Sequence, residues 1–204
     1  MVSNTYTPIV GGVERSIKAF TREYRKRGHR VLILTLEFDN MPEHEEDVIR
    51  LPAIRHFNGS DFSIRLPIPL NLRKFLEDFK PHIVHSHHPF ILGDTALRIA
   101  NEYQIPLIFT HHTKYEDYTH YVPLDSPLMK KFVIELTSGY ADLSDYVIAP
   151  SESIRKYLAD KKTATPVEVV PTGVNMKLFT KGSGRDFRGH WGISDETFLI
   201  GHVG

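Results

Sequence analysis

The stretch "HIVHSHHPFILGDTALRIANEYQIPLIFT" (82–110) contains two short apolar segments separated by a helical pattern. The segments 82–86 and 106–110 are rich in apolar and β-branched residues, which is typical of buried strands. Between them, four apolar residues recur at the spacing of one helix face: Leu92, Ala96, Ile99 and Tyr103. A strand, a helix and a second strand in this order predict a right-handed β-α-β unit and hence a parallel sheet.

The same alternation continues on both sides of this unit. Further apolar segments predict buried strands at 31–36, 47–51, 146–150, 167–171 and 198–203. A helical pattern from Val13 to Tyr24 ends at Gly28, and Ser151 is expected to cap a helix that runs through Leu158. We therefore expect an α/β fold, a Rossmann-like, doubly wound domain with a mainly parallel sheet.

Composition excludes several classes of protein. The 204 residues carry 25 Lys and Arg against 25 Asp and Glu, so no overall charge attracts nucleic acid or anionic lipid. Cysteine is absent, which excludes disulfides, thiolate zinc sites and a cysteine nucleophile. The apolar runs are far shorter than the roughly 18 residues of a membrane span. We expect a cytoplasmic protein that can at most lie on the inner face of a membrane.

Both ends of the sequence are expected to interrupt a structural element. Met1 and Val2 are too few residues for a buried central strand, although the loop that follows them resembles the exit of one. Residues 180–196 read as a polar linker with one or two amphipathic turns, and the strand at 198–203 begins a new unit. The predicted organisation is one domain over 1–180, followed at 181–204 by a linker and the first strand of a truncated second domain.

Polar or glycine-rich segments follow the predicted strands at their carboxyl ends. They are 4–14, 85–90, 110–115, 149–153 and 171–175. In an open parallel sheet, ligands bind outside the carboxyl ends of the strands. These loops are therefore expected to converge on one binding edge.

Gly11 and Gly12 stand directly before the first predicted helix. Unpaired N–H groups at a helix start favour an anion, and glycine lets a phosphate approach closely. A tight turn before a helix explains the pair equally well. Neither a G-x-G-x-x-G dinucleotide fingerprint nor a P-loop occurs in the chain.

Seven of the twelve histidines lie between His82 and His120, and three readings are open. His85, His87 and His88 could bind a metal if Asp94, Asp117 or His120 completed the set. Histidines at strand ends could equally serve only to hydrogen-bond neighbouring loops. As a third reading, neutral imidazoles beside tyrosines suit a hydroxyl-rich ligand such as a sugar. The tyrosines in question are Tyr115, Tyr118 and Tyr121.

An ordered set of segments resembles the N-terminal domain of glycosyltransferase family 4. The segments are "PIVGGVE" (8–14), "RKRGHRVLILT" (25–35), "KPHIVHSHHPF" (80–90), "IPLIFTHHT" (105–113), "APSESIRKYL" (149–158) and "VVPTGVNMKLF" (169–179). The resemblance covers roughly residues 1–180. It implies the GT-B architecture, in which two Rossmann-like domains face each other across a cleft, and it explains a strand at 198–203 as the start of the donor-binding domain.

The resemblance also implies roles for individual residues. Gly11 and Gly12 match the loop that approaches the donor diphosphate, and His112 matches the catalytic-site histidine beside the transferred sugar. Acceptor-binding positions are Glu14, His87, His88, Tyr115 and Tyr118. Family members retain the anomeric configuration and need neither a metal nor another cofactor. Their donors are nucleotide sugars such as UDP- or GDP-sugars.

The implied partners are a nucleotide-sugar donor, a lipid or sugar acceptor, and a C-terminal domain in cis that carries the basic donor-binding residues. The segment 111–123 resembles family members that glucosylate diacylglycerol, and the apolar and basic helix expected at 126–140 suits peripheral membrane contact. Without the second domain, this chain alone is expected to be inactive. The alternatives are a non-catalytic carbohydrate- or nucleotide-binding domain and a metal-dependent hydrolase.

Overall fold

The computed structural model describes residues 1–54, 64–65, 72–121, 126–174 and 176–201. The chain forms two compact units, Met1–Thr172 and Gly173–Gly204. Four elements of the first unit have no counterpart among the sequence predictions: helix α2 (Leu72–Phe79), the 3₁₀ helix η2 (Tyr115–Tyr121) and two short antiparallel strands, β3 (Ala53–Ile54) and β4 (Ile64–Arg65).

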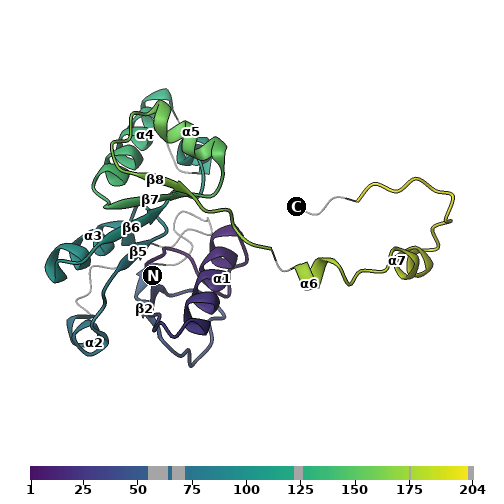
Figure 1. Cartoon of the computed structure of the whole chain (residues 1–204), viewed down its shortest axis with the longest axis horizontal. Coiled ribbons are helices and arrows are strands. Elements are labelled where there is room, and N and C mark those ends of the chain that lie inside the picture. The colour runs from purple at the N-terminus through teal and green to yellow at the C-terminus, as the bar shows by residue number, and fades with distance from the viewer. Residues whose placement is uncertain (55–63, 66–71, 122–125, 175, 202–204) are drawn as a thin grey trace. The chain divides into compact units, whose positions relative to one another are not determined.

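A parallel sheet organises the first unit (Figure 1). Its strands β5 (Val84–Ser86), β6 (Leu107–Thr110), β7 (Tyr146–Ala149) and β8 (Val167–Val169) pair in this order. Strand β1 (Ile33–Leu36) pairs in parallel with β2 (Val48–Leu51). Val2 joins the two groups, because it forms parallel bridges to Leu34 of β1 and Ser86 of β5.

Helices connect the parallel strands. They are α1 (Gly12–Lys26), α3 (Leu92–Tyr103), α4 (Pro127–Asp142) and α5 (Glu152–Asp160). The serine predicted to cap α5 does so, since the Ser151 hydroxyl accepts from the Ile154 N–H at 3.4 Å. Parallel strands joined by crossover helices confirm the predicted fold class, an α/β domain with a mainly parallel sheet.

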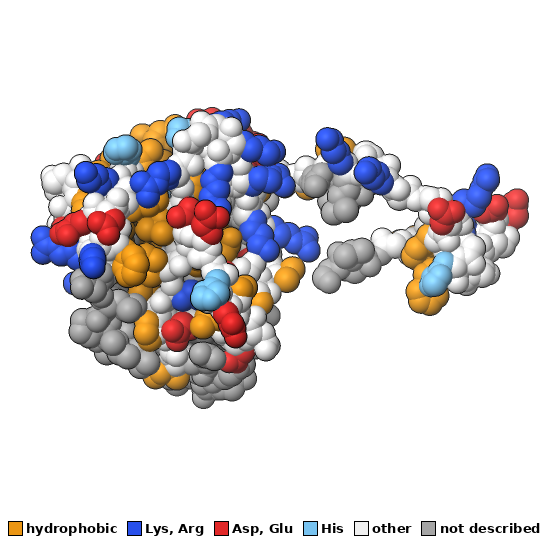
Figure 2. Space-filling model, turned by 90° about the horizontal axis from the view of Figure 1, so that it is seen from below, with side chains coloured by type: hydrophobic (Ala, Val, Ile, Leu, Met, Phe, Trp, Pro, Cys, Tyr) orange, Lys and Arg blue, Asp and Glu red, His pale blue; other side chains and the backbone are white. Residues whose placement is uncertain are grey.

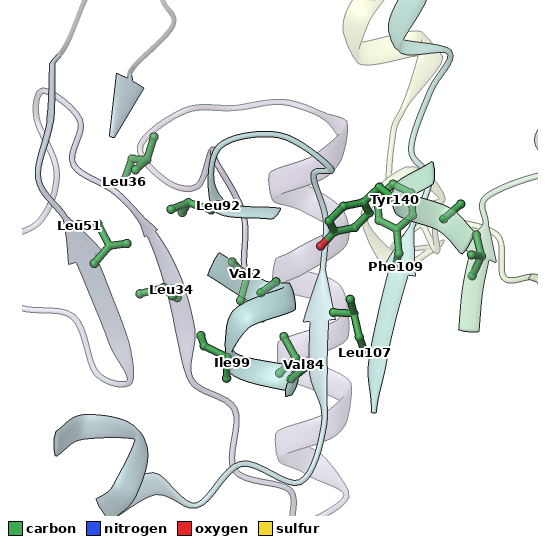
Figure 3. Packing of buried hydrophobic residues seen from close by; sticks show 14 of the residues in the cluster. Val2, Leu34, Leu36, Leu51, Val84, Leu92, Ile99, Leu107, Phe109 and Tyr140 are labelled. Atoms are coloured by element: carbon green, nitrogen blue, oxygen red, sulfur yellow. The ribbon is translucent and has the colours of Figure 1, made fainter. Parts of the chain in front are cut away.

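The two faces of the sheet have separate apolar cores. Ile33 packs with Ile17 of α1 on one face, whereas its neighbour Leu34 packs with Leu92 and Ile99 of α3 on the other. Figure 1 shows α1 and α3 on opposite sides of β5, and Figure 3 shows the second core, in which Leu34, Val84 and Leu92 share one layer with Phe109 and Tyr140. Adjacent residues of a strand point to opposite faces, so β1 is covered on both faces, as in doubly wound folds.

Close packing at Gly93 fixes the start of α3 against the loop after β5. A Cβ atom at Gly93 would lie 2.6 Å from the His88 carbonyl oxygen, which leaves no room for any side chain. The Tyr140 hydroxyl of α4 donates to the Gly93 carbonyl at 3.1 Å. Helix α4 therefore holds α3, and α3 holds the histidine-rich loop.

The second unit contains two short helices and no strand among its described residues. Helices α6 (Met176–Phe179) and α7 (Gly184–Trp191) lie in it, and α7 accounts for the amphipathic turns expected within 180–196. The strand predicted over 198–203 is wrong for residues 198–201, the part that the structure describes, because they form no strand. A strand needs a neighbour for its N–H and C=O groups, and this unit contains no described strand that could provide one.

Candidate functional site

Two histidine pairs follow adjacent strands at the carboxyl edge of the sheet. β5 ends at Ser86 and leads into His87 and His88, and β6 ends at Thr110 and leads into His111 and His112. The parallel register pairs Ser86 with Phe109, so the two pairs emerge side by side. His87 Nδ1 lies 3.0 Å from His112 Nε2, and their rings are nearly parallel, with centroids 5.2 Å apart and an interplanar angle of 25°.

A third imidazole extends this stack into the sheet. The ring of His85 lies 4.2 Å from that of His87, centroid to centroid, at an angle of 29°. Its Nε2 is 2.7 Å from the Thr110 hydroxyl. Phe20 of α1 covers the pair, with its ring centroid 5.6 Å from that of His85. The stacked rings thus lead from beneath α1 to the sheet edge, in the order His85, His87 and His112.

His88 joins the loop after Val2 to the loop after β5. Its Nδ1 accepts from the Asn4 N–H at 3.2 Å and lies 3.2 Å from the Ser3 hydroxyl. Asn4 also caps α3 from a distance, because its Oδ1 accepts from the Leu92 N–H at 3.0 Å. The sequence analysis did not identify Asn4, although an Asn directly after a strand is a common loop-forming signal.

Burial keeps the histidines neutral. Desolvation lowers the pKa of His85 and His88 to about 3, and that of His112 to about 4. The pKa of His87 is lowered well below its usual value by burial and then by the neighbouring histidines. A neutral imidazole carries one N–H donor and one acceptor nitrogen. At neutral pH the site therefore offers hydrogen bonds to hydroxyl groups and no imidazolium.

His111 does not reach the site. Its ring is fully buried and packs against Phe109 and Tyr115, with centroids 5.7 and 5.3 Å away. Neither ring nitrogen has a hydrogen-bond partner among the described residues, and burial lowers its pKa to about 4. Of the two adjacent histidines, only His112 is placed to meet a ligand.

The tyrosines of η2 occupy different environments. Tyr115 packs edge-on against Phe90, 5.3 Å between centroids, and its hydroxyl lies 3.5 Å from the His87 carbonyl oxygen. Burial raises the pKa of this hydroxyl. Tyr118 is half exposed. Tyr115 therefore supports the histidine loop from behind, whereas the side chain of Tyr118 is partly exposed to solvent.

The first turn of α1 is free of side-chain caps. Gly11, at the N-cap, provides no side-chain hydrogen bond. A Cβ atom at Gly12 would meet nothing within 4 Å, while one at Gly11 would lie 2.5 Å from Oε2 of the buried Glu14. The backbone N–H groups of this turn are consequently available to an anion that approaches from the side of Gly12.

The remaining candidates for a site are less well placed. Within the described ranges, no three His, Asp or Glu side chains are grouped to hold a metal ion, and Asp94 forms an ion pair with Arg98 at 2.8 Å. A cavity of about 860 Å³ lies by the amino ends of the strands, where Leu32 and Ile83 line it. That edge is opposite the one where open parallel sheets bind ligands.

The described helices and one face of the surface bear on contact with a membrane. None of the described helices is long and apolar enough to cross a bilayer. Figure 2 shows Lys and Arg side chains interspersed with Asp and Glu on one face. Exposed pairs such as Arg73 with Glu77 and Arg155 with Glu152 illustrate this mixing. This face therefore carries charges of both signs.

Comparisons with known proteins identify the family of the chain. The family model Glycosyltransferase Family 4 matches residues 10–178. The α-monoglucosyldiacylglycerol synthase of Streptococcus pneumoniae is 35% identical over 187 residues, which cover 89% of this chain and 41% of that protein. The enzyme of the same name from Acholeplasma laidlawii is 29% identical over 192 residues, covering 89% of this chain and 47% of that protein.

Solved structures show the same fold at low sequence identity. Anabaena HepE in complex with UDP and glucose superposes with a TM-score of 0.62 at 14% identity, covering 94% of this chain and 49% of that one. The chain thus spans less than half the length of these relatives. The match over residues 10–178, together with the 35% identity to a glycolipid synthase, shows that the chain belongs to glycosyltransferase family 4, of which it forms the N-terminal domain.

Proposed function

We propose that this chain is the acceptor-side half of a retaining glycosyltransferase that moves glucose from UDP-glucose to diacylglycerol. Two relatives are named as synthases of α-monoglucosyldiacylglycerol, and a protein of similar fold binds UDP and glucose. Because glucose is α-linked both in UDP-glucose and in the product, the transfer retains the configuration of its anomeric carbon. The basic residues for the donor belong to a second domain, which the family joins to this one.

One structural observation carries this proposal. The neutral His112, which follows β6, and the uncapped first turn of α1 both lie at the carboxyl edge of the sheet. As the bond from the sugar to the diphosphate breaks, negative charge grows on the leaving phosphate, which the helix N-terminus stabilises. The acceptor hydroxyl attacks from the same face and gives its proton to the departing phosphate oxygen. His112 hydrogen-bonds the transferred sugar, most strongly as the bond to the diphosphate breaks.

The proposal is tested with a protein that carries this domain followed by a donor-binding domain. UDP-glucose and vesicles containing diacylglycerol are expected to give α-glucosyldiacylglycerol, with unchanged yield in the presence of a chelator. The 204-residue chain alone is expected to show little or no transfer, since it lacks the donor contacts that stabilise the transition state. Donor binding without transfer would instead support a binding domain, and chelator-sensitive hydrolysis would support a metal-dependent hydrolase.

Gly12→Asp is expected to weaken donor binding without weakening the fold. Gly12 is the first residue of α1 and has open space around it, and a carboxylate there favours the helix dipole by about 0.3–1 kcal/mol. The same carboxylate repels a diphosphate a few ångströms away by about 2–4 kcal/mol, so KM for the nucleotide sugar should rise roughly thirtyfold or more.

Gly12→Asn is the matched control, because it has nearly the same size and no charge. We expect a much smaller rise in KM for Gly12→Asn, with the melting temperatures of both variants equal to or above that of the parent protein. Equal KM values for the Asp and Asn variants would show that no donor phosphate lies at this turn.

The acceptor is proposed to reach the site from a membrane surface through α4. This helix exposes an apolar row, Leu128 (77% exposed), Phe132 (58%) and Leu136 (36%), spaced four residues apart along one side. Lys130 and Lys131 are exposed beside it. Apolar side chains flanked by lysines suit the surface of an anionic bilayer.

Phe132→Glu is expected to lower binding to anionic vesicles about tenfold or more, since it removes roughly 1.5–3 kcal/mol of aromatic burial. Vesicle flotation of the 204-residue chain measures this directly. Tyr146→Glu is the control, because Tyr146 is also an exposed aromatic residue but begins β7 at the amino edge of the sheet. Flotation that is unaffected by Phe132→Glu, or absent for the parent chain, would exclude α4 as the membrane contact.

A further inference from the structure

We infer that His87 is a positioning residue that holds His112 in a single neutral tautomer, with the proton on Nδ1, so that His112 presents an N–H donor to the sugar. The role toward a sugar rests on the proposed function. The tautomer itself does not, because it can be measured in this chain without any substrate.

The contact between the two rings leaves His112 one free nitrogen. His112 Nε2 is 3.0 Å from His87 Nδ1, which is a hydrogen-bond distance. One of these two nitrogens carries the shared proton, and a neutral imidazole has only one N–H. The protonation of His87 therefore decides which form His112 takes.

Burial of His87 determines where its proton lies. His87 is completely buried, and its Nε2 has no hydrogen-bond partner among the described residues. The neighbouring Phe20 ring, 6.4 Å away between centroids, provides no polar atom. An orphaned buried N–H is rarer in proteins than an unpaired acceptor. The proton of His87 is thus on Nδ1, and it is donated to His112 Nε2.

His87 cannot turn to offer its other nitrogen. Its ring lies between those of His85, 4.2 Å away, and His112, 5.2 Å away. Its backbone N–H donates to the Val2 carbonyl at 2.9 Å, and the Tyr115 hydroxyl lies against its carbonyl oxygen. A side chain fixed on both faces and along its backbone gives the hydrogen bond a fixed direction.

The consequence for His112 is chemical as well as geometric. With Nε2 accepting from His87, the proton of neutral His112 is on Nδ1, the ring nitrogen that is left to meet a ligand. The Nδ1–H of His112 then donates a hydrogen bond to an oxygen of the sugar. In the opposite tautomer it would accept from a sugar hydroxyl, so His87 determines which hydrogen bond the sugar can form.

Nuclear magnetic resonance of the ¹⁵N-histidine-labelled 204-residue chain tests the tautomer at pH 7.5. Long-range ¹H–¹⁵N spectra distinguish protonated from unprotonated ring nitrogens, and the His112→Ala and His87→Asn variants assign the signals. We expect His112 to show a protonated Nδ1 and an unprotonated Nε2. A His112 protonated on Nε2, or exchanging between both forms, would overturn the inference.

Two variants of His87 test the positioning role. Asparagine places an amide N–H near the position of imidazole Nδ1, whereas leucine fills similar space without a donor. His87→Asn is expected to keep His112 in the Nδ1–H form, and His87→Leu to shift it toward the Nε2–H form that histidine favours in water. In the two-domain protein, His87→Leu should lower kcat about tenfold, the scale of a misdirected hydrogen bond, with KM for the acceptor unchanged.

Each result supports or opposes one statement. Rescue of kcat by asparagine supports positioning, and equal kcat for parent, Asn and Leu proteins opposes it. If His87→Leu does not fold, the spectrum of the parent chain and the Asn variant still decide the tautomer. The Nδ1–H form in a protein that transfers no sugar would leave the tautomer established and refute the proposed function.

Discussion

Replacing His112 with alanine is expected to lower kcat by about a hundredfold or more in a protein that contains both domains, the scale of losing one preorganised polar contact to the transition state. The hydrogen bond from His112 is directed by His87 at 3.0 Å, so it requires no rearrangement as the sugar changes shape. A contact that matters only as the bond breaks changes kcat more than KM. Steady-state kinetics with UDP-glucose and a diacylglycerol acceptor measure both constants.

His82→Ala is the matched control, because His82 is exposed near the amino end of β5. It should retain the kcat of the parent protein. Circular dichroism of both variants verifies that they are folded. A folded His112→Ala protein with the kcat of the parent would show that His112 does not contact the transferred sugar.

Much of the fold was predictable because each central element carries its own local pattern. The segment 106–110 predicted a strand and β6 spans Leu107–Thr110, while the helix expected from Leu92 to Tyr103 is α3 with the same limits. Buried parallel strands are apolar on both faces, and the helices that cover them repeat every three to four residues. These patterns can be recognised in the sequence without knowing which strands pair with each other.

Elements stabilised by distant residues were not predictable in this way. Val2 adds two bridges to the sheet, although two residues alone form no strand pattern. Conversely, residues 198–201 have the apolar pattern of a strand but form none, because a strand requires a neighbouring strand to pair with. Local preference is a weak guide wherever pairing with distant residues decides the outcome.

The same distinction holds for the candidate site. Its location followed from the rule that loops converge at the carboxyl edge of a parallel sheet. The contact between His87 and His112 joins residues 25 positions apart, and their ring orientations depend on stacking that no sequence pattern reports. The resemblance assigned the two residues to acceptor and donor sides separately, whereas the structure brings them into direct contact. Their roles at a bound sugar remain predictions.

The buried histidines also predict a steep loss of stability in mild acid. Burial lowers the folded-state pKa of His85 to about 3 and of His111 to about 4, and it lowers that of His87 in the same direction. In the unfolded chain each of them titrates near the ordinary value of about 6.5. Below that pH the unfolded state binds more protons than the folded state, so stability is complete above about 6.5 and falls as the pH approaches the folded-state values.

With His88 and His112, whose pKa values burial lowers to about 3 and about 4, five such histidines together cost about 7 kcal/mol of unfolding free energy per pH unit within this window. Since domains of this size are stable by about 5–15 kcal/mol, the chain should unfold near pH 5. Urea melts of the 204-residue chain between pH 8 and 4.5 measure the slope. His111→Leu should reduce that slope by about a fifth, since one of five titrating groups is lost. It should also keep the fold at pH 8, because neither ring nitrogen of His111 has a partner in the described parts of the structure and an apolar side chain of similar size loses no hydrogen bond there.

His82→Gln is the control, because His82 lies at an exposed position. A free energy of unfolding that stays constant from pH 7.5 to 5.5 would mean that these imidazoles are not held neutral by burial, and the argument for a neutral His112 would lose its physical basis.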